Sequence, residues 1–218
     1  MKKKIILGIL LLTLFSTIKP NIKFEIPNLN LKKIVIKNNF FSKDKEIKRS
    51  LSRFYNKNLV FLKNNDIEQA LMKDSFIESF KIKKKYPDTL IIEIFEKKPI
   101  AILLSGKNKF YISEKIDLIK FDNIEYFEDL PYVIGNKDDF EKLYKNLKKI
   151  NFPLDIIKKY TLYNSKRWDL ETTNKIVIKL PQKYYTESLK NYLNLRDKNN
   201  LKKYKIFDYR LKDQLILK

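Results

Sequence analysis

The sequence contains no cysteine and no histidine, and it has only three glycines among its 218 residues. Without thiol and imidazole side chains, the usual zinc sites, Cys or Ser–His nucleophiles and a disulfide framework are excluded. The shortage of glycine argues against a glycine-rich loop that cradles phosphate. We therefore expect no metal, no cofactor and no catalytic residues, and the composition favours a binding protein over an enzyme.

The composition is otherwise that of a folded chain with a strong positive charge. Hydrophobic residues make up 44% and aromatic residues 13% of the sequence, and its length suits one large or two small domains. The formal net charge is +21, yet only five of the 47 basic residues are arginine. Nucleic-acid readers usually depend on arginine, so we interpret the lysines mainly as solvated surface and expect neither a nucleic-acid partner nor a small-molecule substrate. The charge should still favour anionic surfaces, including lipid headgroups.

The N-terminus resembles a membrane-targeting segment. Lys2–Lys4 precede a weakly polar to apolar run, Ile5–Ile18, which Lys19 and Pro20 close. Fourteen helical residues span about 21 Å, less than a hydrocarbon core of about 30 Å. A cleaved signal peptide is the alternative interpretation, but no small-x-small cleavage site follows. We expect a cytoplasmic tail at 1–4 and a retained signal-anchor helix at 5–22, with the remainder exported.

Residues 29–98 show the pattern of a first small module. We expect a strand at Leu31–Lys37, a helix capped by Ser42, and a second helix capped by Asn65. Alternating apolar residues then predict strands at Glu78–Lys85 and Thr89–Glu96. The predicted order is strand–helix–helix–strand–strand. Such a sheet is covered by helices on one face and has open edges, where another chain's strand can dock.

Residues 99–218 predict an α+β module on a mostly antiparallel sheet. Apolar stripes at helical spacing indicate two helices, Asp138–Ile150 and Thr186–Arg196. The expected strands are Ile100–Leu104, Lys109–Ile112, Leu118–Phe121, Tyr132–Ile134, Tyr160–Asn164, Arg167–Leu170, Lys175–Leu180, Ile206–Arg210 and Gln214–Leu217.

The segment Lys81–Leu103 carries a resemblance to a known family. It is similar to the hairpin that ends the POTRA domain of the FtsQ/DivIB bacterial cell-division family. The matching positions are a basic residue, an aromatic, Pro-Asp-Thr-Leu, and then Glu-x-x-Pro-x-Ala: Lys85, Tyr86, Pro87, Asp88, Thr89, Leu90, Glu96, Pro99 and Ala101. The family often has Trp where Tyr86 stands, and a Gly-Asn pair where Asn38-Asn39 follows the first strand. These residues indicate a turn and a domain exit, and we do not interpret Asp88 or Glu96 as catalytic.

Four further stretches resemble the same family in the same order: Phe110–Ile119, Leu130–Gly135, Lys166–Pro181 and Phe207–Lys218. They show departures. Lys115-Ile116 replaces a Gly-containing turn, Asn174 stands where Gly is frequent, and Tyr209 and Gln214 are substitutions in the closing strand.

The resemblance implies an α+β protein with an N-terminal transmembrane helix, a POTRA domain (β-α-α-β-β) and a C-terminal β domain. It implies a single-pass inner-membrane protein with a cytoplasmic N-terminus and a periplasmic bulk. Such a protein acts at the division septum, linking early and late division proteins without catalysis. The family's β domain binds the paired partners FtsB and FtsL through its last strands.

We therefore expect docking by strand addition along 207–217. The candidate partner-binding residues are Phe207, Tyr209, Arg210, Leu215 and Leu217, and Arg210 would pair with a partner carboxylate. The alternative is that Asp208–Arg210 only closes the sheet internally.

The motif Arg167-Trp168-Asp169-Leu170 has two interpretations. Trp168 is the only tryptophan and would suit a partner anchor, but a lone Trp in a strand is more often a residue at the edge of the core.

Two other classes of function remain. One is a POTRA-bearing factor for polypeptide translocation or outer-membrane assembly, which would normally carry several POTRA repeats. The other is a glycosidase-like enzyme that uses two of the clustered carboxylates Glu125, Glu128 and Asp129. With 26 acidic residues in the chain, a local cluster is expected by chance.

Overall fold

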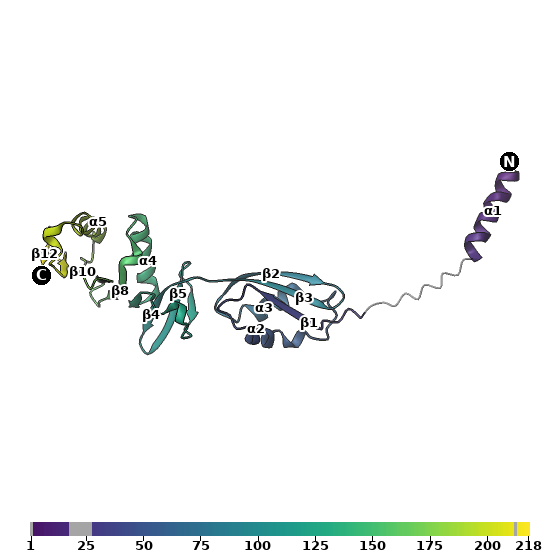
Figure 1. Ribbon diagram of the computed structural model, residues 1–218, viewed down its shortest axis with the longest axis horizontal. Helices are drawn as coiled ribbons and strands as arrows, with labels where there is room; N and C mark the ends of the chain where they lie inside the picture. Colours follow the sequence, from purple (N-terminus) through teal and green to yellow (C-terminus); the bar gives the residue numbers. More distant parts are fainter. Residues whose placement is uncertain (1, 18–27, 212) are drawn as a thin grey trace.

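The computed structural model describes residues 2–17, 28–211 and 213–218. Within them, the strands form one three-stranded and one nine-stranded sheet, which follow each other along the molecule (Figure 1). The chain is therefore a mixed α+β protein, as the sequence predicts.

The helix α1 (Lys2–Thr17) occupies the predicted anchor region. Its apolar residues are consecutive, so they lie on all sides of the helix, and Ile5–Leu12 are exposed. Part of the predicted segment 5–22 lies outside the described residues. No helix in the described part of the chain combines the length and apolarity that a membrane span needs.

The first module has the predicted order of elements. Its elements are β1 (Lys33–Lys37), α2 (Asp44–Ser50), the short 3₁₀ helix η1 (Ser52–Phe54), α3 (Asn64–Leu71), β2 (Ile77–Lys85) and β3 (Thr89–Glu96). The sheet order is β1-β3-β2, with β1 parallel and β2 antiparallel to β3. Residues Leu90, Ile92 and Ile94 alternate toward the helices, where they join Ile47 and Ile67 in one buried core. Alternation with period two thus places one sheet face under both helices.

Both predicted helix caps in this module are wrong. The residue before α2 is Lys43 and the residue before α3 is Lys63, and neither makes a side-chain cap hydrogen bond. Ser42 is buried instead, and its backbone N–H donates to Glu96 Oε1 at 2.6 Å. Asn65 lies within the first turn of α3. The Glu96 carboxylate, which also accepts the backbone N–H groups of Phe40 and Phe41, orders this loop in place of a serine cap.

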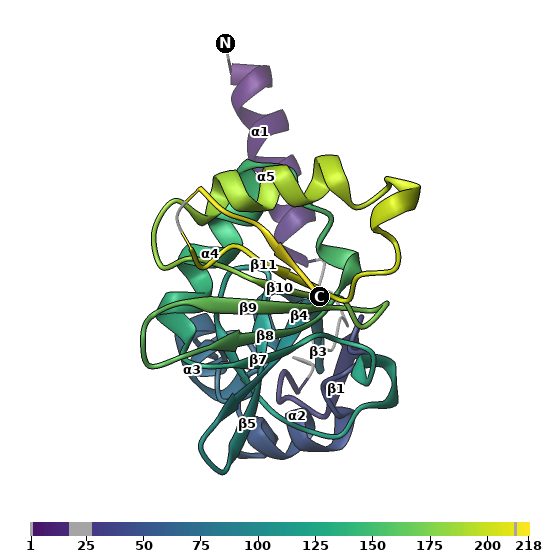
Figure 2. The same cartoon turned by 90° about the vertical axis from the view of Figure 1, so that its left-hand side faces the viewer.

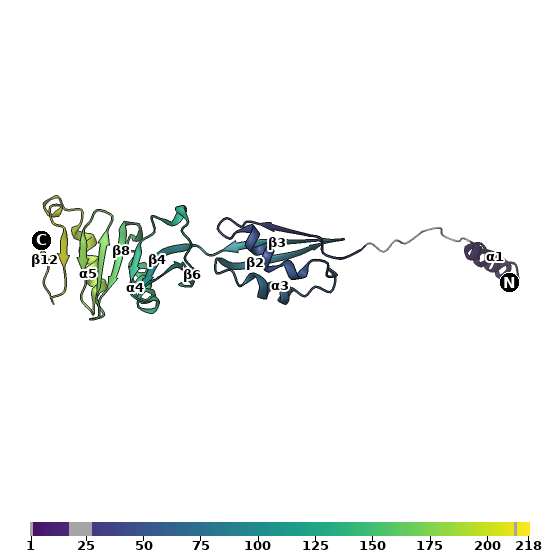
Figure 3. The ribbon, with the colours of Figure 1, turned by 90° about the horizontal axis from the view of Figure 1, so that it is seen from below.

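The second module is built on the nine-stranded sheet. Its elements are β4 (Pro99–Ser105), β5 (Asn108–Ser113), β6 (Leu118–Lys120), η2 (Glu125–Phe127), β7 (Tyr132–Ile134), α4 (Lys137–Lys149), η3 (Leu154–Ile156), β8 (Ile157–Leu162), β9 (Trp168–Thr172), β10 (Val177–Lys179), α5 (Tyr185–Leu195), η4 (Asn199–Leu201), β11 (Ile206–Asp208) and β12 (Ile216–Leu217). The strand order is β12-β11-β10-β9-β8-β7-β4-β5-β6. Most neighbours are antiparallel, as predicted, while β4–β7, β7–β8 and β10–β11 are parallel. Figure 3 shows the sheet running from β6, beside the first module, to β12 at the far end.

The two faces of this sheet have different partners. One face packs against α4 and α5, where Phe140, Leu147 and Tyr192 meet the inward residues of the strands. On the other face, near β4–β6, Tyr111 packs with Phe76 of the first module and with Phe127 in a separate aromatic cluster. The salt bridge between Lys43 and Asp122, at 2.8 Å, also joins the two modules. The modules therefore share a packed junction.

Three departures from the family's glycine pattern fall at or next to left-handed backbone positions. Asn38, Ile116 and Lys175 have φ values of 61°, 64° and 61°. Asn tolerates this region, but a side chain branched at Cβ and a lysine are strained there. Lys175 directly follows Asn174, where the family often has glycine, so the turn between β9 and β10 keeps the geometry without the residue that suits it best.

We predict that Lys175→Gly raises the free energy of unfolding by about 0.5–1 kcal/mol, because relief of left-handed strain exceeds the entropic cost of glycine. Lys175 is exposed, so little packing is lost. Urea unfolding followed by circular dichroism measures the change. Lys175→Ala keeps the Cβ and should give no gain; an equal gain for both variants would refute the strain explanation.

Gly135, the last residue of the Leu130–Gly135 motif, lies where the backbone approaches its neighbours closely. A Cβ at this position would lie 2.9 Å from Leu162 Cβ and 3.4 Å from the Trp168 ring. Its φ of 157° is also one that side-chain-bearing residues rarely adopt. The glycine of this family motif is therefore required mainly by the close approach of Leu162 on β8.

Gly135→Ala should lower the free energy of unfolding by about 1–3 kcal/mol more than Gly106→Ala does, because only Gly135 is crowded. Gly106 also has a positive φ, of 60°, but nothing lies within 4 Å of its added Cβ, so it serves as the matched control. Parallel urea titrations compare the two variants, and equal losses would mean that crowding at Gly135 has no effect.

Candidate functional site

The strand β12 forms the C-terminal edge of the nine-stranded sheet. It pairs with β11 on one side, antiparallel, with Leu217 opposite Phe207 and Ile216 opposite Asp208. On its other side, none of the described residues provides a further strand. Figure 2 views the molecule from this end, where the C-terminus lies beside β11 and β10. The edge is thus the part of this sheet that faces away from the first module.

The hydrogen bonds of β12 show which of its backbone groups face outward. Lys218 and Ile206 exchange both bonds: the Lys218 N–H donates to Ile206 O at 3.1 Å, and the Ile206 N–H donates to Lys218 O at 2.9 Å. In an antiparallel ladder such pairs alternate with pairs whose backbone groups point away from each other. Leu217 is the next residue, so its N–H and C=O point toward the open side. These two groups can pair with an added strand.

The five predicted partner-binding residues lie in different environments. Phe207 is only 1% exposed and packs against Tyr192, and Tyr209 is buried with its hydroxyl donating to Asn191 Oδ1 at 3.0 Å. These two side chains belong to the core. Leu215 and Leu217 are half-buried at its margin. A partner strand beside β12 would therefore meet Leu215 and Leu217 but not the side chains of Phe207 and Tyr209.

Arg210 already has an intramolecular partner. Its guanidinium donates to both carboxylate oxygens of Asp208, with Nη2 at 2.6 Å from Oδ2 and Nε at 2.8 Å from Oδ1. The Arg210 side chain is 45% exposed, whereas the Asp208 side chain is 7% exposed. The hydrogen bond from Arg210 lowers the pKa of Asp208. In this structure Arg210 pairs within the chain, with Asp208, as in the alternative that Asp208–Arg210 only closes the sheet internally.

Asp208 belongs to a row of charged residues across three strands. Lys179 of β10 lies opposite Asp208 of β11 and also opposite Asp169 of β9. Arg167 donates to Asp169 at 2.7 Å. Burial raises the pKa of Asp169, although Arg167 opposes this shift. The row lies on the sheet face opposite α5. Near the edge, the face toward α5 is therefore apolar and the other face is charged.

Trp168 is buried at 5% exposure within the main core, as is Leu170. The interpretation of Trp168 as an exposed partner anchor is therefore wrong in this structure, and the core interpretation is confirmed. Trp168 pairs with Leu162 and its ring lies next to Gly135, so the ring is not accessible to a partner.

The remaining motif residues are at the two ends of the first module. Tyr86, Pro87 and Asp88 form the turn between β2 and β3, with a cis Tyr86–Pro87 bond, and Thr89 and Leu90 begin β3. Pro99 begins β4 and is buried. The first module lies far from β12 in the molecule (Figure 1). These residues therefore shape the first module and lie outside the edge at β12.

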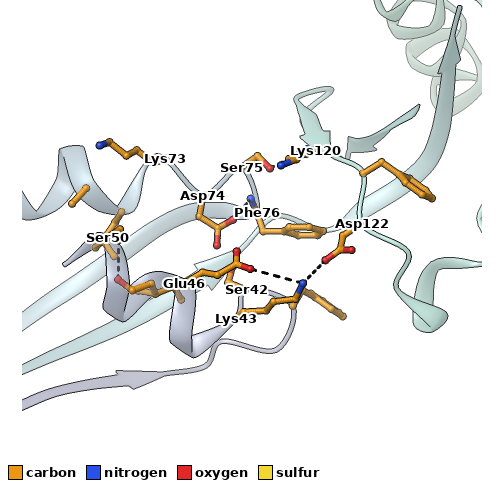
Figure 4. A pocket seen from close by; sticks show the side chains of 15 residues that line it. Ser42, Lys43, Glu46, Ser50, Lys73, Asp74, Ser75, Phe76, Lys120 and Asp122 are labelled. Carbon is orange, nitrogen blue, oxygen red and sulfur yellow. Dashed lines mark hydrogen bonds and ion pairs between the residues drawn. The ribbon is translucent and has the colours of Figure 1, made fainter. Parts of the chain in front are cut away.

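A cavity of about 450 Å³ lies at the junction of the two modules, and sequence reasoning did not predict it. Figure 4 shows Lys43 between Glu46 and Asp122, and all three residues line this cavity. The hydrogen bond with Asp122 raises the pKa of Lys43, and the same bond lowers the pKa of Asp122. Both groups are held in their charged forms, which suits an ion pair better than proton transfer.

The clustered carboxylates Glu125, Glu128 and Asp129 are exposed at η2 and after it. Across the described part of the chain, no group of three or more acidic, histidine or cysteine side chains is arranged to hold a metal ion. Exposure leaves these carboxylates solvated rather than arranged around a substrate.

Comparisons with known proteins match both modules to one family. Residues 29–97 match the family described as POTRA domain, FtsQ-type, and residues 102–210 match Cell division protein FtsQ/DivIB, C-terminal. Cell division protein FtsQ of Rickettsia felis is 31% identical over 158 residues, covering 70% of this chain and 58% of the relative. The protein of the same name from Rickettsia typhi is 32% identical over 154 residues, covering 68% of this chain and 57% of the relative.

A solved structure is also similar over part of the chain. It is the major extracytoplasmic domain of the trans isomer of the division protein DivIB from Geobacillus stearothermophilus, with 14% identity and a TM-score of 0.33. The similarity covers 45% of this chain and 89% of that one.

The matches to the curated relatives span less than three fifths of the relatives' length. The second family match alone covers half of this chain, and the first precedes it in the order expected from the sequence. The chain therefore belongs to the FtsQ/DivIB family of bacterial cell division proteins.

Proposed function

We propose that this protein is a non-catalytic scaffold of the bacterial divisome, which acts at the division septum and binds a membrane-bound partner pair like FtsB and FtsL. Through this binding it links early and late division proteins. Membership of the family supports the role in division. The observation that supports the mode of binding is the open outer side of β12, where the Leu217 backbone groups lack a strand partner among the described residues.

The proposal includes a membrane topology and a domain plan. Residues 1–4 are a cytoplasmic tail, 5–22 a single-pass anchor in the inner membrane, 29–98 a POTRA domain and 99–218 a periplasmic β domain. The apolar sides of α1 and the lysines at its start support the anchor. A short apolar segment is tolerated when flanking lysines extend toward the headgroups or the bilayer thins.

Strand addition at β12 explains how a small edge can bind specifically. A partner strand would pair with the Leu217 N–H and C=O and continue the ladder beyond β12. Its inward side chains would cover Leu215 and Leu217, which extends the main core by one strand. Its other side chains would face the exposed Ile216 and the charged row that contains Asp208. Backbone pairing would give affinity, and the two faces would give specificity.

We predict that Leu217→Pro in the full chain strongly reduces binding of the FtsB/FtsL-like pair in a pull-down. Proline removes the outward N–H and suits an edge position whose N–H faces away from the sheet, so the bonds of Lys218 to Ile206 should persist. Leu217→Ala is the matched control, because it shortens the side chain but keeps the N–H. Comparable binding by the proline variant and wild type would contradict docking at β12.

A point substitution is more informative than truncation after Tyr204. We expect that truncation to abolish partner binding and leave the POTRA domain folded. The deleted residues include β11, and with it the buried Phe207, so the loss of binding would also reflect a damaged core. Leu217→Pro leaves β11 and the Asp208–Arg210 pair in place.

For Arg210 we expect a structural effect that depends on pH. Arg210→Ala should lower the free energy of unfolding by about 1 kcal/mol at pH 7, because buried Asp208 loses a charge-assisted bond. The folded-state pKa of Asp208 is lowered, so the contribution is present above its ordinary pKa of about 3.9 and disappears as the pH falls through the folded-state value.

Urea unfolding at pH 7 and at pH 2–3 measures this difference for Arg210→Ala. Arg196→Ala is the control, because Arg196 contacts an exposed Asp197 at 3.4 Å and should contribute little. A loss for Arg210→Ala that is the same at both pH values would exclude the bond to the Asp208 carboxylate as its cause.

A further inference from the structure

The end of the first module that receives the chain from α1 is made of three segments, which we call the entry end: residues 29–33, 57–63 and 84–88. Backbone hydrogen bonds join them. The Leu31 N–H donates to Lys57 O at 2.9 Å, the Leu59 N–H donates to Leu29 O at 2.8 Å, and the Lys33 N–H donates to Asp88 O at 3.2 Å. Figures 1 and 3 show that this end of the module is opposite the junction with the second module.

Large apolar side chains project from the entry end. Phe61 is 80% exposed, Tyr86 is 53% exposed and Val60 is 45% exposed. The neighbours Leu59 and Leu62 are buried in the core, so the loop is fixed on both sides and only its tip points outward. The exposure of Phe61 is thus a property of a held loop and not of a loose terminus.

Lys84 holds this loop from the strand β2. Its Nζ donates to Leu62 O at 2.6 Å and to Val60 O at 3.3 Å. The Val60 N–H donates to Asn58 Oδ1 at 2.9 Å. These three bonds satisfy backbone groups on both sides of Phe61, so the loop is held in place while the Phe61 ring is exposed.

Lysines share the entry end with these apolar side chains. The entry end carries Lys32, Lys33, Lys57, Lys63, Lys84 and Lys85. None of the six forms a salt bridge within the described ranges 2–17, 28–211 and 213–218. Asp88, which is half-buried and accepts a bond from the Thr89 hydroxyl, is the one acidic residue in these three segments, so the six lysines leave a net positive charge. Aromatic side chains beside lysines whose charge no salt bridge neutralises match the chemistry of a bilayer interface with anionic headgroups.

The length of the connecting chain limits where the entry end can lie. In the proposed topology the anchor ends at residue 22, so five residues, 23–27, connect it to Asn28, and a fully extended chain from residue 22 to Asn28 reaches about 21 Å. If α1 is an anchor, as proposed above, the entry end cannot leave the neighbourhood of the membrane surface. The chain length then holds a surface of this composition within about 21 Å of the anchor's end.

We propose that the entry end docks on an anionic membrane surface, with Phe61 and Tyr86 at the level of the lipid headgroups and the lysines over lipid phosphates. The inference rests on the anchoring part of the proposed function. Docking would orient the elongated molecule with its C-terminal edge away from the bilayer (Figure 3).

A tryptophan reporter in the full chain tests the docking. Phe61→Trp and Phe40→Trp are compared after reconstitution into vesicles of phosphatidylglycerol and phosphatidylcholine that contain brominated acyl chains. Phe40 is 82% exposed and lies at the opposite end of the same module, where its N–H donates to Glu96, so it is a matched control. The buried Trp168 contributes the same background to both variants.

We expect the added emission of the Phe61→Trp variant to fall by about half or more, because bromine quenches rings at membrane depth, while that of Phe40→Trp is unchanged. Quenching should weaken in 0.5 M salt, in vesicles of phosphatidylcholine alone, and after Lys57→Gln, Lys63→Gln and Lys85→Gln are combined. Lys84 is left intact because it supports the loop.

Equal quenching of the two reporters would overturn the docking and leave the entry end as a surface for a protein partner. Strong quenching that is indifferent to salt and lipid charge would overturn the role of the lysines. Flotation of the same vesicles reports on the anchor separately. The loss of partner binding by Leu217→Pro is a third, independent readout, so failure of the docking is distinguishable from failure of the proposed function.

Discussion

The structure depends most on one backbone hydrogen-bond ladder, which runs through the nine-stranded sheet from β6 to β12. Backbone groups removed from water need partners, and each interior strand of this sheet pairs with a strand on both sides. The two edge strands pair on one side among the described residues, and the first module with its adjoining loop lies near the β6 end. The constraint therefore concentrates free backbone groups at β12, at the far end of the molecule.

Packing at the junction keeps that end far from the first module. Phe41, Phe76 and Phe127 form a contiguous aromatic contact, with ring centroids 4.6 Å apart for Phe41 and Phe127. The Lys120 N–H donates to the Ser75 hydroxyl at 3.0 Å, and Lys115 pairs with Glu78. Together with the Lys43–Asp122 bridge, these contacts join the modules by both apolar and polar interactions. An interface of both kinds resists bending more than a flexible linker does.

Local periodicity made much of the fold predictable from the sequence. The strands Thr89–Glu96 and Tyr132–Ile134 have the predicted bounds, because alternation and flanking turn residues mark both ends. Helix caps were not predictable in the same way. Ser42 fits the composition of a cap, but its Oγ makes no hydrogen bond, while its N–H donates to Glu96, which is 54 residues away in the sequence. The conformation of this loop is therefore set by a carboxylate distant in the sequence, which a local capping rule does not include.

The candidate site was predictable only in outline. The family resemblance pointed to the last strands, but sequence alone does not distinguish an edge strand from an interior one. Phe207 and Leu217 are both apolar residues in strands, yet among the described residues β11 has neighbours on both sides and β12 has one. The parallel pairing of β10 with β11, which requires α5 as a crossover, decides this difference. Tertiary topology therefore separates core residues from candidate docking residues within one short segment.

The two surfaces proposed for binding lie at opposite ends of the molecule, and this separation has a physical consequence. The entry end consists of loops fixed to the β1-β3-β2 sheet, whereas the C-terminal edge extends the other sheet, and the junction lies between them (Figure 1). Sites this far apart with no shared contacts are expected to act additively. Contact with a bilayer at one end would therefore leave the Leu217 backbone groups free. A partner strand added at β12 would in turn leave the Phe61 loop unchanged, so the same molecule can occupy both surfaces at once.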